Sequence, residues 1–190
     1  MPSPAHWTIR KDAKCAAVKI ILEFVKCIKA LDCIKRFFVC LYCNMDLEKI
    51  ENRLQDLKSD SPPKFGIMSA QHMVEHLILT IKLSYGRVKI PDFSPNEKQL
   101  NAKQALLYTD MEFPEGVRAP GLPAELLELR YPDLDTAKEE LKKAIVAYQE
   151  TYAKSPEAKF LHTRFGLLSH KEWEIFHHKH IGHHFRQFGI

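Results

Sequence analysis

Residues 45–190 contain four segments in which apolar side chains recur at the intervals of an amphipathic helix. The first covers residues 46–57, the second about 70–84 and the third about 134–153. The fourth opens with the capping-box sequence Ser169–Glu172, where Ser stands at the cap and Glu three residues later. No stretch of useful length alternates apolar and polar residues as a half-buried strand would. The pattern therefore predicts an all-α domain.

A long connection separates the second and third of these helices. Residues 85–133 hold six of the eleven prolines, and only a short helix near 97–107 is expected inside them. A connection this long can cross the full length of a bundle, so that the two helices it joins run parallel. We therefore expect a four-helix bundle with one long crossover between helices two and three.

Residues 1–44 differ from the rest in composition. They contain all five cysteines, and eight Lys/Arg against three Asp/Glu, whereas residues 45–190 hold twenty against twenty-one. The charges interrupt the apolar residues, so we expect neither a transmembrane helix nor a signal peptide here. The segment is either an amphipathic helix that docks on a surface or membrane, or an extension foreign to the domain, with Met45 as the start of translation. The predicted organisation is thus an N-terminal extension, 1–44, and a helical domain, 45–190.

The charge and the cysteine content limit which partners and which cellular compartment are expected for this chain. Five cysteines is an odd number and none lies in the domain, which favours a reducing, cytoplasmic setting over a disulfide framework. The domain is close to neutral and lacks the basic stripe that nucleic acid requires. We expect a small-molecule substrate, no nucleic acid and no integral membrane segment, and a homodimer is compatible with a bundle of this size.

Histidines crowd the last helix. Five of the ten lie within the eight residues 177–184, and His180 and His184 have the i, i+4 spacing that places two side chains on one helix face. Two neutral imidazoles so placed can hold one divalent metal, with a third ligand from another element. At about 100° per residue, His178 lies about 160° from His180, on the far face, while His177 and His183 lie about 60° to either side. Those two are candidates for contacts around the ligands.

The second helix carries the other histidine pair, His72 and His76, and one of these could supply the third nitrogen. Three neutral ligands with an open position are typical of a catalytic metal rather than a structural one. Three imidazoles suit zinc, nickel, iron or copper, and we expect zinc or nickel first. The same spacing also arises by chance in helices that bind no metal. Glu75 is turned about 100° from His76, so we do not expect it to act as a general base.

Two motifs resemble those of the DinB-like superfamily. His180, His184 and Gln187 match the H-x3-H-x2-Q signature of its last helix, and Met68–Leu77 resembles its second helix, whose motif ends on a histidine. The string from Phe165 to Gly189 is similar to one branch known mainly as a domain of unknown function. The resemblance covers about residues 45–190.

The resemblance implies a four-helix bundle in up-down-down-up order and a divalent metal held by His76, His180 and His184, with Gln187 orienting its neighbours. It also implies a metal-dependent enzyme, either a hydrolase or a thiol-dependent transferase, in which the metal activates a water or a small thiol cofactor. His72, His177 and His183 are additions to the family pattern. The alternative is a non-catalytic bundle that binds a metal or a small ligand.

Overall fold

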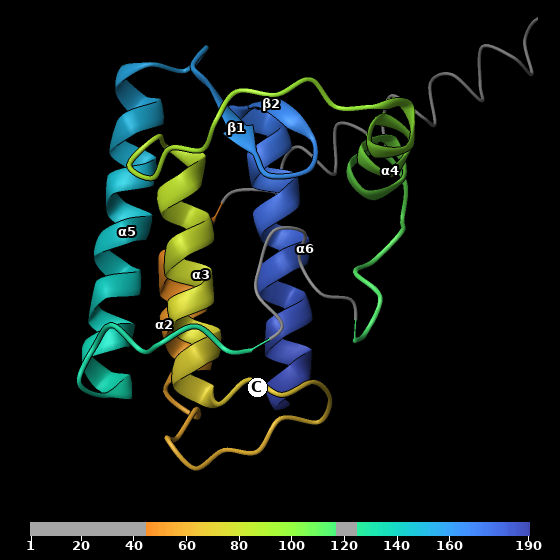
Figure 1. Cartoon of the computed structure of the whole chain (residues 1–190). Coiled ribbons are helices and arrows are strands. Elements are labelled where there is room, and N and C mark those ends of the chain that lie inside the picture. The colour runs from red at the N-terminus through yellow and green to blue at the C-terminus, as the bar shows by residue number, and fades with distance from the viewer. Residues whose placement is uncertain (1–44, 117–124) are drawn as a thin grey trace, which may run out of the picture. The chain divides into compact units, whose positions relative to one another are not determined.

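The computed structural model describes residues 45–116 and 125–190, so the predicted extension 1–44 lies outside the described residues. This part of the chain is mostly helical, with one small antiparallel sheet of two strands (Figure 1). The elements are α2 (Leu47–Leu54), α3 (Ala70–Ser84), α4 (Glu97–Tyr108), α5 (Leu134–Lys154), β1 (Lys159–His162), β2 (Gly166–Ser169) and α6 (His170–Phe188). None of its helices is long and apolar enough to cross a membrane.

Each described helix begins at a polar residue that caps its first turn. In all five, the cap side chain accepts a hydrogen bond from the backbone N–H three residues later, which satisfies a donor that has no partner within the helix. The caps are Asp46, Ser69, Asn96, Asp133 and Ser169. The predicted capping box at α6 is present, because Glu172 Oε2 also accepts from Ser169 N at 2.8 Å.

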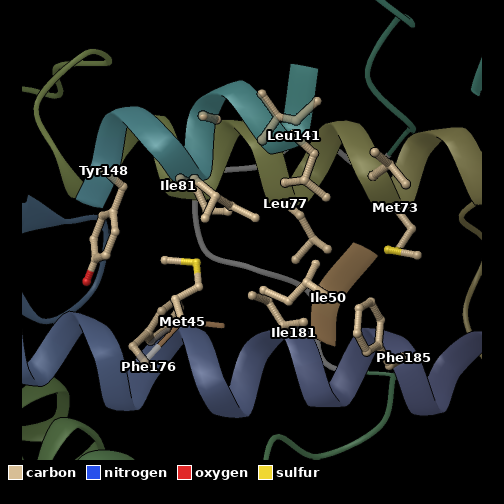
Figure 2. Packing of buried hydrophobic residues seen from close by; sticks show 14 of the residues in the cluster. Met45, Ile50, Met73, Leu77, Ile81, Leu141, Tyr148, Phe176, Ile181 and Phe185 are labelled. Atoms are coloured by element: carbon tan, nitrogen blue, oxygen red, sulfur yellow. The ribbon is translucent and has the colours of Figure 1, made fainter. Parts of the chain in front are cut away.

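The apolar faces of the long helices meet in one core. Met73, Leu77 and Ile81 of α3 point toward residues of α5 and α6, as Figure 2 shows. From the other side, Ile181 and Phe185 of α6 fill the same interior. Burial of these side chains is the main driving force that holds the helices together.

The long connection ends with α5 beside α3. The two helices contact each other along their length and run in the same direction, whereas α6 runs the opposite way (Figure 1). The connection contains α4 near the position predicted, which packs against α6. This arrangement brings the middle of α3 against the C-terminal half of α6, where the predicted ligands lie.

The structure differs from the expectation of no strands between α5 and α6. Lys159–His162 pairs with Gly166–Ser169 as an antiparallel hairpin. Each strand has only four residues, which is too short for an alternating pattern to be recognised. The first helix also ends at Leu54, three residues before the predicted end, although Leu57 remains buried.

Candidate metal centre

Three histidines from two helices point their outer ring nitrogens at one another. His76 lies in the middle of α3, and His180 and His184 lie one turn apart on α6. His180 Nε2 is 3.0 Å from His76 Nε2 and 3.1 Å from His184 Nε2. One nitrogen from each of the three lies within 4.8 Å of the others, so together they could hold a metal ion. The structure thus brings together the three residues that the family resemblance implied.

Gln187 determines which nitrogen of His184 faces this centre. The amide of Gln187 donates from Nε2 to the carbonyl oxygen of Phe65 at 2.8 Å, so its Oε1 is free to accept. That oxygen lies 2.8 Å from His184 Nδ1, which must then carry the proton. A neutral imidazole has one N–H, so Nε2 of His184 carries a lone pair. A hydrogen bond of this kind on the far nitrogen is the usual arrangement for a metal-binding histidine.

Gly66 makes this contact sterically feasible. Its φ of +77° lies in the left-handed region, and a Cβ atom there would come within 2.8 Å of Gln187 Nε2. The backbone of Lys64 is also tied to α6, because its N–H donates to the carbonyl of Gln187 at 2.7 Å. The loop before α3 is therefore fastened to the end of α6 beside the histidines.

Hydrogen bonding among the three histidines cannot satisfy all of their nitrogens. An imidazole nitrogen carries either a proton or one lone pair in the ring plane. If His180 Nε2 carries the proton, it can donate well to only one of its two neighbours. If it carries the lone pair, it can accept from His76 but faces the lone pair of His184. A cation between three lone pairs removes this conflict, so the side chains fit a metal better than they fit one another.

The spacing of the nitrogens is close to that of a zinc site. At Zn–N distances of about 2.0–2.1 Å, tetrahedral angles place two ligand nitrogens about 3.3 Å apart. The observed separations, 3.0 and 3.1 Å, need only a small outward shift to reach that value. One feature departs from the usual pattern: the buried Nδ1 of His180 has no hydrogen-bond partner among the described residues.

All three imidazoles are held neutral, which is the form that binds metals. Burial lowers the pKa of His76 from its ordinary 6.5 to about 4, and the nearby His183 adds to the shift. Burial, and then the charge of His76, lower the pKa of His184 to about 3, although its hydrogen bond with Gln187 opposes the change. The pKa of His180 lies well below its usual range, first because of burial and then because of its two histidine neighbours.

The other histidines near the cluster lie outside the centre. His178 is exposed, as the helix geometry predicted. His177 is buried, but its Nε2 lies 2.8 Å from Ser84 Oγ, whose own proton goes to the carbonyl of Ile81. His177 therefore donates to Ser84 and serves packing between α6 and α3. His183 packs against Phe113 and against the edge of His184, with ring centroids 5.8 and 5.2 Å apart.

His72 is the histidine of α3 that does not join the centre. Its Nδ1 lies 2.6 Å from the hydroxyl of Ser69, the residue that caps the helix. The ring lines the wall of a cavity, and its nitrogens are not among those that converge at the centre. The residues alone left His72 and His76 open as the source of the third nitrogen, and the packing of α3 against α6 selects His76.

A cavity of about 310 Å³ adjoins the centre. Its lining includes His76 and His184 together with Gln187, so a small molecule in the cavity can reach the cluster. Apolar side chains line it from the loop before α3, from α3 itself and from the connection, among them Ile67, Leu79 and Leu126. A volume of this order is at the lower end of the range for small-molecule sites.

Three sets of contacts outside the centre were not predicted from the sequence, those of Glu75, Glu174 and His162. Glu75 accepts hydrogen bonds from the backbone N–H groups of Arg130 and Tyr131, and so clamps the end of the connection to α3. Glu174 accepts from Met45 N at 2.8 Å, and burial raises the pKa of its carboxyl. His162 lies at the end of β1 and stabilises the hairpin turn. No motif distinguishes these residues, because each depends on a backbone group brought near by the fold.

Comparison of the chain with protein-family models, curated protein sequences and solved structures finds no match. What the chain does must therefore be inferred from its own side chains.

Proposed function

We propose that His76, His180 and His184 hold one divalent metal ion and that the chain is a metal-dependent enzyme of the DinB-like type. The observation that carries the proposal is the convergence of three Nε2 atoms that cannot satisfy one another by hydrogen bonds. A divalent ion there would lower the pKa of a coordinated water or small thiol and so supply a nucleophile near neutral pH. The reaction class is hydrolysis or thiol-dependent transfer. Zinc or nickel is the metal we expect first, because three imidazoles suit either.

The cavity supports a small-molecule substrate for this centre. Two of the three histidines of the cluster, His76 and His184, line it. Residues 45–190 contain no cysteine, so the thiol of a transferase reaction would come from a separate cofactor. Gln187 would hold His184 in the tautomer that binds the metal, through the hydrogen bond described above.

We further propose that α2, α3, α5 and α6 form a four-helix bundle in up-down-down-up order. The shared direction of α3 and α5, and the long connection between them, support this order. The cytoplasmic setting and the homodimer stay predictions.

The test is elemental analysis of protein purified without a histidine tag. We expect one metal ion per chain in the wild type and in the control His178→Ala, which removes an exposed histidine of the same helix. We expect no stoichiometric metal in the double variant His180→Ala/His184→Ala. Far-UV circular dichroism would verify that the double variant remains helical. Unchanged metal content in the folded double variant would refute the proposal.

One observation favours the alternative of a non-catalytic metal- or ligand-binding bundle. Glu75, the carboxylate nearest to His76 in sequence, is engaged by backbone N–H groups and by Gln71, and is not free to act as a base. Turnover of activated esters and of small thiols by the metal-loaded protein distinguishes the two. Tight metal binding with no turnover of either class would favour the binding module.

A further inference from the structure

The cavity follows one side of α3 and leads away from the histidine centre. His72, His76, Leu79 and Lys82 all line it from this helix. At 1.5 Å per residue, Lys82 lies about 9 Å along the helix axis from His76. A ligand that touches the histidine centre at one end can therefore reach Lys82 at the other.

Lys82 is a cation without a carboxylate partner among the described residues. Its Nζ donates to the hydroxyl of Tyr131 at 3.2 Å and lies 6.0 Å from the centre of that ring. Glu140 of α5 is close enough for Lys82 to help lower the pKa of its carboxyl. However, Glu140 forms its ion pair with Lys143, at 2.7 Å. The charge of Lys82 is thus available to an anion in the cavity.

The acids in the cavity wall do not take up this charge. Glu75 Oε2 accepts from Arg130 N at 2.8 Å, and its Oε1 accepts from Tyr131 N at 3.2 Å and from Gln71 Nε2 at 3.1 Å. These three donors stabilise the carboxylate where it is. Glu125 and Glu128 are exposed at the rim, where water screens their charge.

Apolar residues also line the cavity. Ile78 and Leu79, which lie between His76 and Lys82 on α3, line it together with Val88. An apolar chain or ring would bury its surface there, whereas a polar middle section would lose hydrogen bonds to water.

We infer that the ligand of this cavity is a small carboxylic acid with an apolar body, whose carboxylate binds Lys82 and whose other end reaches the histidine centre. The inference rests on the proposed metal site, because it takes that site as the position of the reacting end. Tyr131 acts as a positioning residue, since its hydroxyl accepts from the ammonium group and holds it at the wall.

The experiment compares two metal-chelating probes of equal length on the zinc-loaded full chain by calorimetry. Suberic acid monohydroxamate carries a terminal carboxylate, and its terminal amide is the neutral counterpart. If Lys82 forms a hydrogen-bonded charge pair with the carboxylate, the wild type should bind the carboxylate probe about tenfold or more tightly than the amide. In Lys82→Met this preference should vanish while the affinity for the amide stays the same. Lys89→Met removes an exposed lysine of the following loop and should keep the preference.

The outcomes separate this inference from the proposed function. A wild-type protein that retains no zinc overturns the metal site itself. A zinc-loaded protein that binds both probes equally, or that keeps its preference in Lys82→Met, overturns the carboxylate subsite and leaves the metal site standing. A zinc-loaded protein that binds neither probe also overturns the inference, because the cavity would then not lead to the metal.

Discussion

Gln187 connects the metal centre to the loop before α3. Its amide has one group on each side: the oxygen accepts from His184, and the nitrogen donates to the carbonyl of Phe65. Because both ends are engaged, the amide cannot rotate without losing a hydrogen bond. The orientation of His184 is therefore set by a residue that need not touch the metal.

Replacement of Gln187 by Met should weaken metal binding. Methionine fills a similar volume but cannot accept the Nδ1 proton of His184, so the ring would lose its orientation. We expect zinc affinity to fall about 10–100-fold, as is typical for loss of a hydrogen bond to a ligating histidine. Competition with a chromophoric chelator measures the affinity. The matched control is Gln149→Met on α5, whose side chain bonds, among the residues that the structure describes, to the carbonyl of Met45 alone. An equal loss in both variants would contradict the orienting role.

The candidate site was partly predictable from single residues. The i, i+4 spacing of His180 and His184, and the outward position of His178, follow from helix rotation alone. Helix rotation does not decide between His76 and His72, because both lie near the same face of α3, one turn apart. The choice depends on which turn of α3 packs against the histidines of α6. Helix rotation also does not predict the burial of His177. The rotation angles describe α6 alone, whereas burial depends on the other elements that pack against more than one side of it.

At the scale of the element, Ser169 is the residue on which the start of α6 depends. Its Oγ accepts a hydrogen bond from Glu172 N, and the carboxylate of Glu172 in turn accepts one from Ser169 N. Ser169→Ala should lower the free energy of unfolding by about 1 kcal/mol, because the capping hydroxyl is lost. Ser169→Thr keeps the hydroxyl and should lower the free energy of unfolding by only a few tenths of a kcal/mol. Urea unfolding followed by circular dichroism gives both values, and equal losses would exclude the hydroxyl as the cause.

His162 makes the hairpin before α6 sensitive to acid. Its Nδ1 accepts from the backbone N–H groups of Arg164 and Phe165 at 3.1 and 3.2 Å, so the folded state requires this nitrogen to be unprotonated. Burial lowers the pKa of His162 from 6.5 to about 3, with the charges of Arg164 and Lys103 adding to the effect. Between these two values the unfolded chain binds a proton that the folded chain does not. The stabilising contribution is therefore complete above pH 6.5 and is lost as the pH falls toward 3.

The variant that tests this is His162→Asn, which keeps an acceptor near the same position but does not titrate. Over that pH window, the free energy of unfolding of the wild type should fall more steeply than that of the variant, by about 1.4 kcal/mol per pH unit. Urea unfolding at several pH values, with a chelator present, measures the two slopes. The exposed His178→Asn should follow the wild type. Parallel profiles for His162→Asn and the wild type would show that the turn does not depend on the neutral ring.

The elements themselves were predictable to different degrees. The helices α2, α3, α5 and α6 carry their own signals, apolar spacing and a capping residue, so local sequence places them within a few residues. The hairpin does not, because its strands are short and the side chain that stabilises it, His162, bonds to backbone groups whose positions exist only after folding. The direction of α5 followed from the length and proline content of the connection rather than from α5 itself.

Across the whole molecule, metal binding should couple to stability. His76 and His180 stand 104 residues apart in sequence and meet only when α3 packs against α6, so an ion between them binds the folded chain. A ligand that binds only the folded chain, at a free concentration of about a hundred times Kd, adds about 2.7 kcal/mol to the free energy of unfolding. Urea unfolding with and without zinc should give this difference in the wild type and none in His180→Ala/His184→Ala. The same gain in the double variant would place the binding elsewhere.

The two short nitrogen contacts of His180 have a consequence for motion in the metal-free chain. Whichever nitrogen carries the proton, at least one of them cannot be a well-formed hydrogen bond, which weakens the buried contact between α3 and α6 at that point. The last two turns of α6 should then open locally more often than the rest of the core, and their amides should exchange hydrogen for deuterium faster. A bound ion would slow that exchange at the same amides. The metal-free chain is thus less rigid at the position where the ion would bind. A map of the amides whose exchange slows on adding metal would locate the centre without a measurement of activity.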